Sequence, residues 1–305
     1  MLNEYVEIKK SQAFLVEDIP LFIKNAKNEY VLYKSEKLRL DHQLYDDQHL
    51  PALFVRNEDK RRAIAEVQKA LNIALYDRIR AGGLYRVKEV LNETVREALA
   101  NPTEGTLDHL PETIELLFNA YINETQALKM LADMVNREGS IVDHSINVMI
   151  FTMNLAAYIG FSADDAKLLS LGALLHDIGK TKIPATICSA DHRLSDDEFD
   201  SNKKHTAIGY ALLKECRTLE PRVAVGALEH HERLDGSGYP MGIKNVSLDG
   251  QIIGIINSFE HLSFREKSYR KARKPFDAMS VIRNEIMEEG KFCKGLFAEL
   301  CKSLG

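Results

Sequence analysis

The sequence His176-Asp177-Ile178-Gly179-Lys180 is followed, at a domain-scale distance, by His230-His231-Glu232-Arg233-Leu234-Asp235-Gly236-Ser237-Gly238-Tyr239-Pro240. Two adjacent imidazoles that lead into a glycine-rich turn offer nitrogen ligands beside backbone that can approach a bound molecule closely. The earlier His-Asp pair adds another nitrogen and a carboxylate that can bridge two cations. These residue types predict a metal centre that is assembled from distant parts of the chain.

The surroundings of these segments predict helices that present the ligands. Ser162 precedes Asp165 in a capping-box arrangement, and the apolar run that follows ends at the His-Asp pair, where Gly179 provides a stop. A proline opens another short helix at Pro221, and this helix ends at His230. We therefore expect the His-Asp pair at the C-terminal end of a helix and the other histidines on helices of their own.

The two segments together resemble the HD-GYP family, a branch of the HD phosphohydrolases that hydrolyses cyclic di-GMP. The resemblance covers roughly residues 125–305. It includes the flanking motifs Ala173-Leu174-Leu175, Ile183-Pro184 and Arg193-Leu194-Ser195, with Glu198 leading to His205. The fold that it implies is mainly α, an HD-type helical bundle preceded by a small α/β N-terminal module.

Changes in residue composition and hydrophobic periodicity along the chain predict three structural units. Residues 1–57 contain short β-rich runs separated by polar clusters, which is typical of a small α/β accessory or sensory module. Residues 58–124 have a helical pattern with a pause at Gly82-Gly83, and their apolar stripes favour a helical linker that pairs between chains as a homodimer seam. Residues 125–305 form the HD-GYP domain.

Composition limits the partners and the compartment. The 305 residues carry a net charge of -5, from 45 acidic and 40 basic residues spread along the chain, so no basic field argues for duplex nucleic acid. The four cysteines have no CxxC spacing, and the chain shows neither a secretory leader nor an apolar run long enough for a membrane span. We therefore expect a cytoplasmic protein.

The resemblance implies a set of metal ligands. His144, His176 and Asp177 would surround one metal, and Asp177 would bridge to a second metal held by His205, His230 and His231. Such a nitrogen-rich site with a bridging carboxylate suits Fe or Mn, the metals that the family most often uses, and also Zn. His261 is a further candidate by residue type, but it matches no family position.

Three positions depart from the family pattern. Relatives carry a metal-binding Asp where this chain has Asn257, and a second Asp where it has Glu260. Asn257 can still offer a carbonyl oxygen to a metal, but it brings no negative charge, so we expect weaker metal binding. Ser140 stands where relatives with a third metal have a Glu, so a trinuclear site is not expected.

The same resemblance assigns the catalytic and substrate-binding residues. In the family, a hydroxide that bridges the two metals attacks phosphorus. The resemblance implies that Asp177 is the carboxylate shared by the two metals and that Lys180 contacts the scissile phosphate. The loop residues would bend around the substrate or orient a histidine, and Tyr239 would stack on or hydrogen-bond the ligand or a partner domain. Either Lys267 or Arg265 would meet a phosphate. The substrate-binding candidates are Lys180, Asp235, Gly236, Gly238, Tyr239, Arg265 and Lys267.

Three functions follow from these observations. The first is hydrolysis of cyclic di-GMP to pGpG, with GMP as the alternative end product. The second, supported by Asn257, is a catalytically weakened protein that binds cyclic di-GMP and signals through a protein partner at the Gly-Tyr-Pro loop or the N-terminal module. The third is a general HD nucleotide phosphohydrolase, which the Gly-Tyr-Pro loop disfavours.

Overall fold

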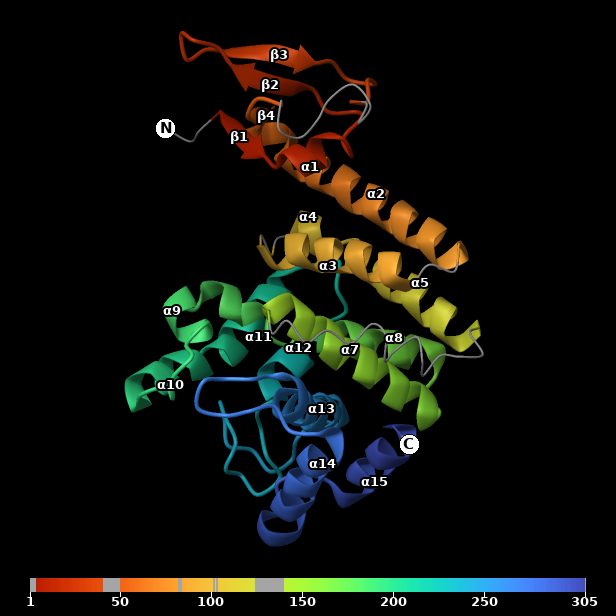
Figure 1. Ribbon diagram of the computed structural model, residues 1–305, viewed down its shortest axis with the longest axis vertical. Helices are drawn as coiled ribbons and strands as arrows, with labels where there is room; N and C mark the ends of the chain where they lie inside the picture. The colour runs from red at the N-terminus through yellow and green to blue at the C-terminus, as the bar shows by residue number, and fades with distance from the viewer. Residues whose placement is uncertain are drawn as a thin grey trace.

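The computed structural model describes residues 4–40, 50–81, 84–100, 102, 104–123 and 140–304. A small β-sheet lies at one end of an elongated molecule, and helices form the rest (Figure 1). The predicted fold class, mainly α with a small N-terminal α/β module, is confirmed. The pause at Gly82-Gly83 and the predicted boundary between residues 124 and 125 lie outside the described residues.

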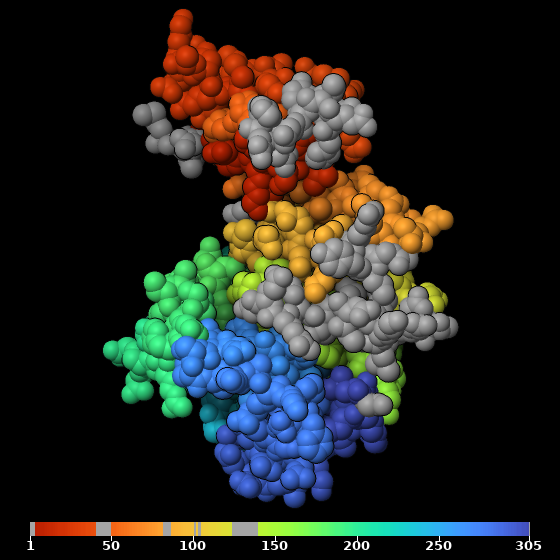
Figure 2. All heavy atoms as spheres, in the orientation of Figure 1, coloured from red at the N-terminus to blue at the C-terminus, as the bar shows by residue number. Residues whose placement is uncertain are grey.

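The N-terminal sheet has four short antiparallel strands in the order β1-β4-β2-β3. The strands are β1 (Tyr5–Ile8), β2 (Leu21–Lys24), β3 (Tyr30–Lys34) and β4 (Leu53–Arg56), with the short helix α1 (Lys10–Ala13) after β1. Leu21, Leu53 and Val55 are buried in a core of their own. In the space-filling view this module forms a separate lobe beyond the helices (Figure 2).

Two long helices connect this lobe to the rest of the chain. After the turn η1 (Asn57–Asp59), α2 (Lys60–Arg80) contributes Ala63, Val67 and Leu71 to the N-terminal core and Leu75 to the large helical core. The next helix, α3 (Leu84–Ala100), packs against α2 on one side and against the helical domain on the other. Much of the apolar stripe that predicted a seam between chains is therefore covered within one chain, while Ile73 and Tyr76 of α2 stay exposed, and the homodimer stays a prediction.

The helical domain is built around α7 (Ile141–Tyr158), which is buried along almost its whole length. It packs against α8 (Ala163–Leu175) and α13 (Leu248–Phe264), while α12 (Pro221–Glu229) packs against α8, α11 (His205–Glu215) and α13. The remaining elements are α4 (Glu104–Leu107), α5 (Leu110–Asn123), η2 (Ile178–Lys182), α9 (Ala185–Cys188), α10 (Asp196–Lys203), α14 (Pro275–Asn284), η3 (Glu285–Glu289) and α15 (Lys294–Leu304). The described helices include none that is long and apolar enough to cross a membrane.

Serine caps begin several of these helices. The Ser162 hydroxyl accepts a hydrogen bond from the Asp165 amide at 3.1 Å, which is the start of α8 that the sequence predicts. Ser140 caps α7 in the same way, by accepting from the Asp143 amide at 3.0 Å. The position where relatives with a third metal carry a Glu is therefore occupied here by a helix cap.

Candidate metal centre

Asp177 lies at the point where four helical elements meet. It is the residue between α8 and η2, directly after His176, which ends α8. His144 comes from the first turn of α7, His205 is the first residue of α11, and His230 follows the last residue of α12. All five side chains are 0–1% exposed. The fold thus brings the predicted ligands of both metals into one buried cluster.

Each carboxylate oxygen of Asp177 faces two imidazoles. Its Oδ2 atom lies 3.4 Å from His144 Nε2 and 3.5 Å from His176 Nε2. Its Oδ1 atom lies 3.3 Å from His205 Nε2 and 3.6 Å from His230 Nε2. Two sets of convergent ligand atoms result, and they share Asp177: a first group of His144, His176 and Asp177, and a second group of Asp177, His205, His230 and His231.

In three of these rings the Nδ1 atom, which points away from Asp177, lies beside a backbone carbonyl oxygen, a group that can only accept a hydrogen bond. The Nδ1 atom of His176 is 2.7 Å from the Ala173 carbonyl oxygen, and His230 Nδ1 is 3.0 Å from the carbonyl oxygens of Gly226 and Ala227. His205 Nδ1 contacts the Asn202 carbonyl oxygen in the same way. In the neutral tautomer that satisfies these acceptors, Nδ1 carries the hydrogen and the inner Nε2 presents a lone pair.

Burial determines the charge state of the cluster. It lowers the pKa of His205 to about 3, and it also lowers the pKa values of His176 and His230 below the ordinary range. Burial alone would raise the pKa of Asp177, but Lys180 and the surrounding imidazoles outweigh it and hold that pKa well below its usual value. At neutral pH the imidazoles of His176, His205 and His230 are therefore neutral, and they surround one carboxylate.

This donor set fits two divalent metal ions. The Nε2 atoms of His144 and His176 are 3.1 Å apart, and those of His205 and His230 are 3.3 Å apart, so lone pairs face one another. Among the described residues, the buried Oδ1 atom of Asp177 has no hydrogen-bond partner. Converging lone pairs and an unpaired carboxylate oxygen are costly when buried, and a cation in each group removes that cost.

Glu260 was noted in the sequence only as a departure from the family pattern, without a role of its own. Its Oε2 atom accepts a hydrogen bond from His144 Nδ1 at 2.5 Å, and its Oε1 atom accepts one from Asn147 Nδ2 at 2.9 Å. A carboxylate in this position fixes the orientation of a ligating imidazole and increases its basicity. Asn257 is buried one helical turn earlier on α13. The sequence feature that could have indicated a role for Glu260 is a carboxylate within an otherwise apolar stretch of helix.

The loop after His231 is held in place from inside. Glu232 is 4% exposed and accepts hydrogen bonds from the Met241 and Ile243 amides at 2.7 and 3.1 Å, so it clasps the two ends of the loop together. A side chain at Gly238 would place its Cβ 2.5 Å from the His231 carbonyl oxygen, which explains the glycine. No sequence pattern had indicated this role for Glu232.

This loop places a half-buried aromatic ring beside the second group. The Tyr239 ring stacks on His231, with ring centroids 4.5 Å apart and planes 22° apart. Gly236 has a φ of 86°, which favours glycine. Asp235 accepts hydrogen bonds from the Ser237 amide at 3.0 Å and from its hydroxyl at 2.8 Å, so it orients the loop rather than a histidine.

The basic residues Lys180, Lys267 and Arg265, which were predicted to bind phosphate, differ in their contacts. The Lys180 ammonium pairs with Asp177 Oδ2 and is partly exposed beside the cluster. The Lys267 ammonium donates to the Ala190 carbonyl oxygen at 2.7 Å, which occupies it in a structural contact. Arg265 follows α13, lowers the pKa of Glu260, and has a buried Nε atom without a partner among the described residues. Arg265 is therefore the freer of the two candidates for a phosphate.

His261 lies apart from both ligand groups within the described part of the chain. It is an exposed residue of α13, on the turn that follows Glu260. The structure thus agrees with the family positions in leaving this histidine outside the cluster.

Comparison with known proteins supports this assignment of the helical domain. A family model described as HD domain matches residues 129–288. The chain is 27% identical to the cyclic di-GMP phosphodiesterase PA4108 of Pseudomonas aeruginosa, over 76% of this chain and 56% of that protein. It is 30% identical to the 3′3′-cGAMP-specific phosphodiesterase 1 of Vibrio cholerae, over 58% of this chain and 42% of that protein. The chain therefore spans about half the length of these curated relatives.

A solved structure shares the fold over nearly the whole chain. It is Bd1817, a HDG"Y"P protein from Bdellovibrio bacteriovorus, with a TM-score of 0.65 and 19% identity, covering 98% of this chain and 99% of that one. The likeness thus includes the N-terminal module as well as the helical domain. From the matched family model and the motifs around the cluster, the chain belongs to the HD domain family and, within it, to the HD-GYP branch.

Proposed function

We propose that this protein hydrolyses the 3′-5′ phosphodiester of cyclic di-GMP to linear pGpG, with two divalent transition metals at the candidate centre. The observation that carries the proposal is the two groups of buried histidines that share Asp177. We propose iron or manganese, the metals that the family most often uses, and zinc is also compatible with this ligand set. Two such ions would lower the pKa of a bound water and neutralise charge on the phosphoryl oxygens.

The chain's own residues then position the substrate. Lys180 approaches the bridging carboxylate from the partly exposed side, where its ammonium can contact a phosphate that lies over Asp177. Arg265 adds a second cation near the first group, and its guanidinium can hold a phosphate through two parallel hydrogen bonds. Tyr239, stacked on His231, offers an aromatic face for a base at the rim of the second group.

The choice of substrate rests on what the relatives act on. One is named as a cyclic di-GMP phosphodiesterase and another as specific for 3′3′-cGAMP, so both act on a cyclic dinucleotide. We infer that the substrate class is the same here, with cyclic di-GMP as the primary substrate. The Gly-Tyr-Pro loop and the N-terminal module are the surfaces that we propose for a protein partner.

Chromatographic analysis of the products tests the proposal. The metal-free protein is reconstituted with Mn(II), with Fe(II) under anaerobic conditions, or with Zn(II), and is then incubated with cyclic di-GMP or 3′3′-cGAMP. We expect pGpG from cyclic di-GMP with Mn(II) or Fe(II), and no product from an Asp177→Ala variant. If every reconstituted form binds cyclic di-GMP without forming product, the hydrolytic function is wrong and the protein is a cyclic di-GMP effector.

A further inference from the structure

A row of aromatic rings leads from the second group of metal ligands to the surface. Tyr239 stacks on His231, and the ring of Phe199 in α10 meets the ring of Tyr239 nearly at a right angle, with centroids 6.0 Å and planes 84° apart. Phe199 is 43% exposed, whereas Tyr239 is half-buried. The last ring of the row is therefore open to a molecule that approaches the metal centre.

Helix α10 holds Phe199 in a defined place beside the centre. Ser195 and Glu198 begin the helix with a capping box, in which the Ser195 amide donates to the Glu198 carboxylate at 2.9 Å. The Lys203 ammonium, one turn after Phe199, lies 4.7 Å from the centre of the Phe199 ring, so it covers one face of that ring. The chain then enters α11, which starts with the metal ligand His205. The position of Phe199 is thus fixed relative to the second group.

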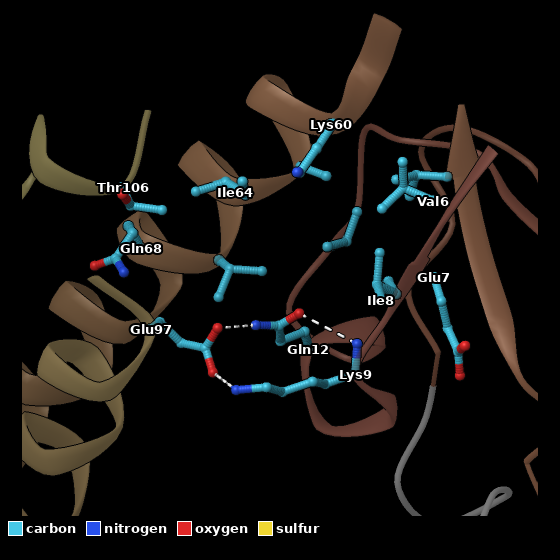
Figure 3. Close-up of a pocket in the computed structure, with 14 residues that line it drawn as sticks. Val6, Glu7, Ile8, Lys9, Gln12, Lys60, Ile64, Gln68, Glu97 and Thr106 are labelled. Atoms are coloured by element: carbon cyan, nitrogen blue, oxygen red, sulfur yellow. Dashed lines mark hydrogen bonds and ion pairs between the residues drawn. The ribbon is translucent and has the colours of Figure 1, made fainter. Parts of the chain in front are cut away.

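The cavity between the N-terminal module and the linker helices has a different lining (Figure 3). Its volume is about 190 Å³, and its described wall consists of aliphatic, charged and other polar side chains without an aromatic ring. The Glu97 carboxylate in this wall is occupied, since it accepts hydrogen bonds from the Lys9 ammonium and the Gln12 amide. None of the lining residues is a ligand of the metal centre. An aromatic base of a substrate at the metal centre therefore finds its ring partners at the rim and not in this cavity.

We propose that Phe199 contacts the substrate: its ring stacks on a purine base of the cyclic dinucleotide while the scissile phosphate lies at the metal centre. This inference rests on the proposed function and adds a residue that determines which phosphodiesters are bound. Stacking on an aromatic side chain is favourable for every base, because each base has a π-face. Phe199 thus favours diesters that carry a base, and it favours cyclic di-GMP and 3′3′-cGAMP to a similar extent.

Steady-state kinetics of the Mn(II)-loaded protein test the contact through matched variants. Phe199→Ala should raise the KM for cyclic di-GMP and for 3′3′-cGAMP about tenfold each, because a stacking contact is lost, while kcat stays within about twofold of the wild type. Phe199→Tyr keeps an aromatic face and should keep the KM. A purely structural role of Phe199 would instead lower kcat and Mn(II) binding through Tyr239 and His231, so a metal titration accompanies the kinetics.

A fluorescence experiment detects the contact independently of turnover. The chain has no tryptophan, so Phe199→Trp introduces a single indole at the proposed site. Guanine quenches indole fluorescence when the two rings stack, and we expect saturable quenching of Phe199→Trp by cyclic di-GMP in stopped-flow mixing. Tyr158→Trp is the control, because Tyr158 is 50% exposed at the end of α7 opposite His144. Its fluorescence should stay unchanged.

The outcomes separate the base contact from the hydrolytic function. If the wild type forms pGpG while Phe199→Ala keeps the wild-type KM or Phe199→Trp shows no quenching, the base contact is overturned and the hydrolytic function stands. If the wild type forms no pGpG, the hydrolytic function is wrong. Quenching of Phe199→Trp then still supports the base contact in a binding protein, and its absence overturns that contact.

Discussion

Replacing Asn257 by Asp should have opposite effects on the metal-free and the metal-loaded protein. Asn257 is 7% exposed and precedes the 2% exposed Glu260 by three residues, so the two side chains share a face of α13. Without metal, a second buried carboxylate on this face would repel the first. With metal, an anionic oxygen compensates a cation far better than a neutral carbonyl does in a partly dry pocket.

The magnitudes follow from burial. An unsatisfied buried charge costs about 2 kcal/mol or more, which in a chain of 305 residues lowers the Tm by about 3 °C in the presence of chelator. In the loaded protein we expect Asn257→Asp to bind Mn(II) about tenfold more tightly, a gain of about 1.4 kcal/mol. Turnover at limiting metal should rise by about the same factor, because occupancy increases.

The assay is a thermal melt of the wild type, Asn257→Asp and Asn257→Leu in chelator and in saturating Mn(II), combined with a metal titration. Asn257→Leu is the matched control, because it keeps the side-chain size while it removes the oxygen. We expect it to weaken metal binding at the first group. If both variants bind Mn(II) like the wild type, Asn257 lies outside the coordination sphere and the reasoning is refuted.

Three further perturbations test other parts of the centre. Replacing His230 and His231 together with Ala should remove metal from the second group and abolish hydrolysis while the helical circular dichroism is kept; wild-type turnover in this variant would contradict the assignment. Glu260→Gln should weaken metal binding at the first group by about 10- to 100-fold, because the hydrogen-bonded carboxylate behind His144 is lost, and an unchanged metal titration would count against that role. The pKa of His205 is lowered from 6.5 to about 3, so the unfolded chain binds more protons than the folded protein within this range. Denaturant unfolding in chelator should therefore show stability falling as pH decreases below about 6.5, by up to about 1.4 kcal/mol per pH unit for each such histidine, and a flat profile between pH 7 and pH 4.5 would oppose this.

The sequence was sufficient where local patterns determine structure. The β-rich runs predicted within residues 1–57 became the four strands, and the Ser162 cap and the Pro221 start fall at the beginnings of α8 and α12 as predicted. The histidines converge because each one is at or near the end of a helix that packs into one core. Amphipathic periodicity and capping chemistry are local signals, so a single sequence reveals them.

Other features depend on contacts between distant segments and could not be predicted. The apolar stripes of α2 and α3 suggested a seam between chains, yet periodicity cannot say whether the covering surface belongs to the same chain or to another. Glu260 departs from the family pattern, but its role depends on its hydrogen bond to His144 on α7. The sequence could not choose between Lys267 and Arg265 as the phosphate ligand, because the Lys267 ammonium is occupied by a carbonyl oxygen from a distant segment, that of Ala190.

Elemental analysis of the purified protein tests the central claim most directly. The protein is prepared anaerobically, and its metal content per chain is measured before and after reconstitution with Fe(II) or Mn(II). The two ligand groups that share Asp177 predict about two transition-metal ions per chain, and about one after the double replacement of His230 and His231. A content below half an equivalent, with no uptake on reconstitution, would contradict the two-metal centre.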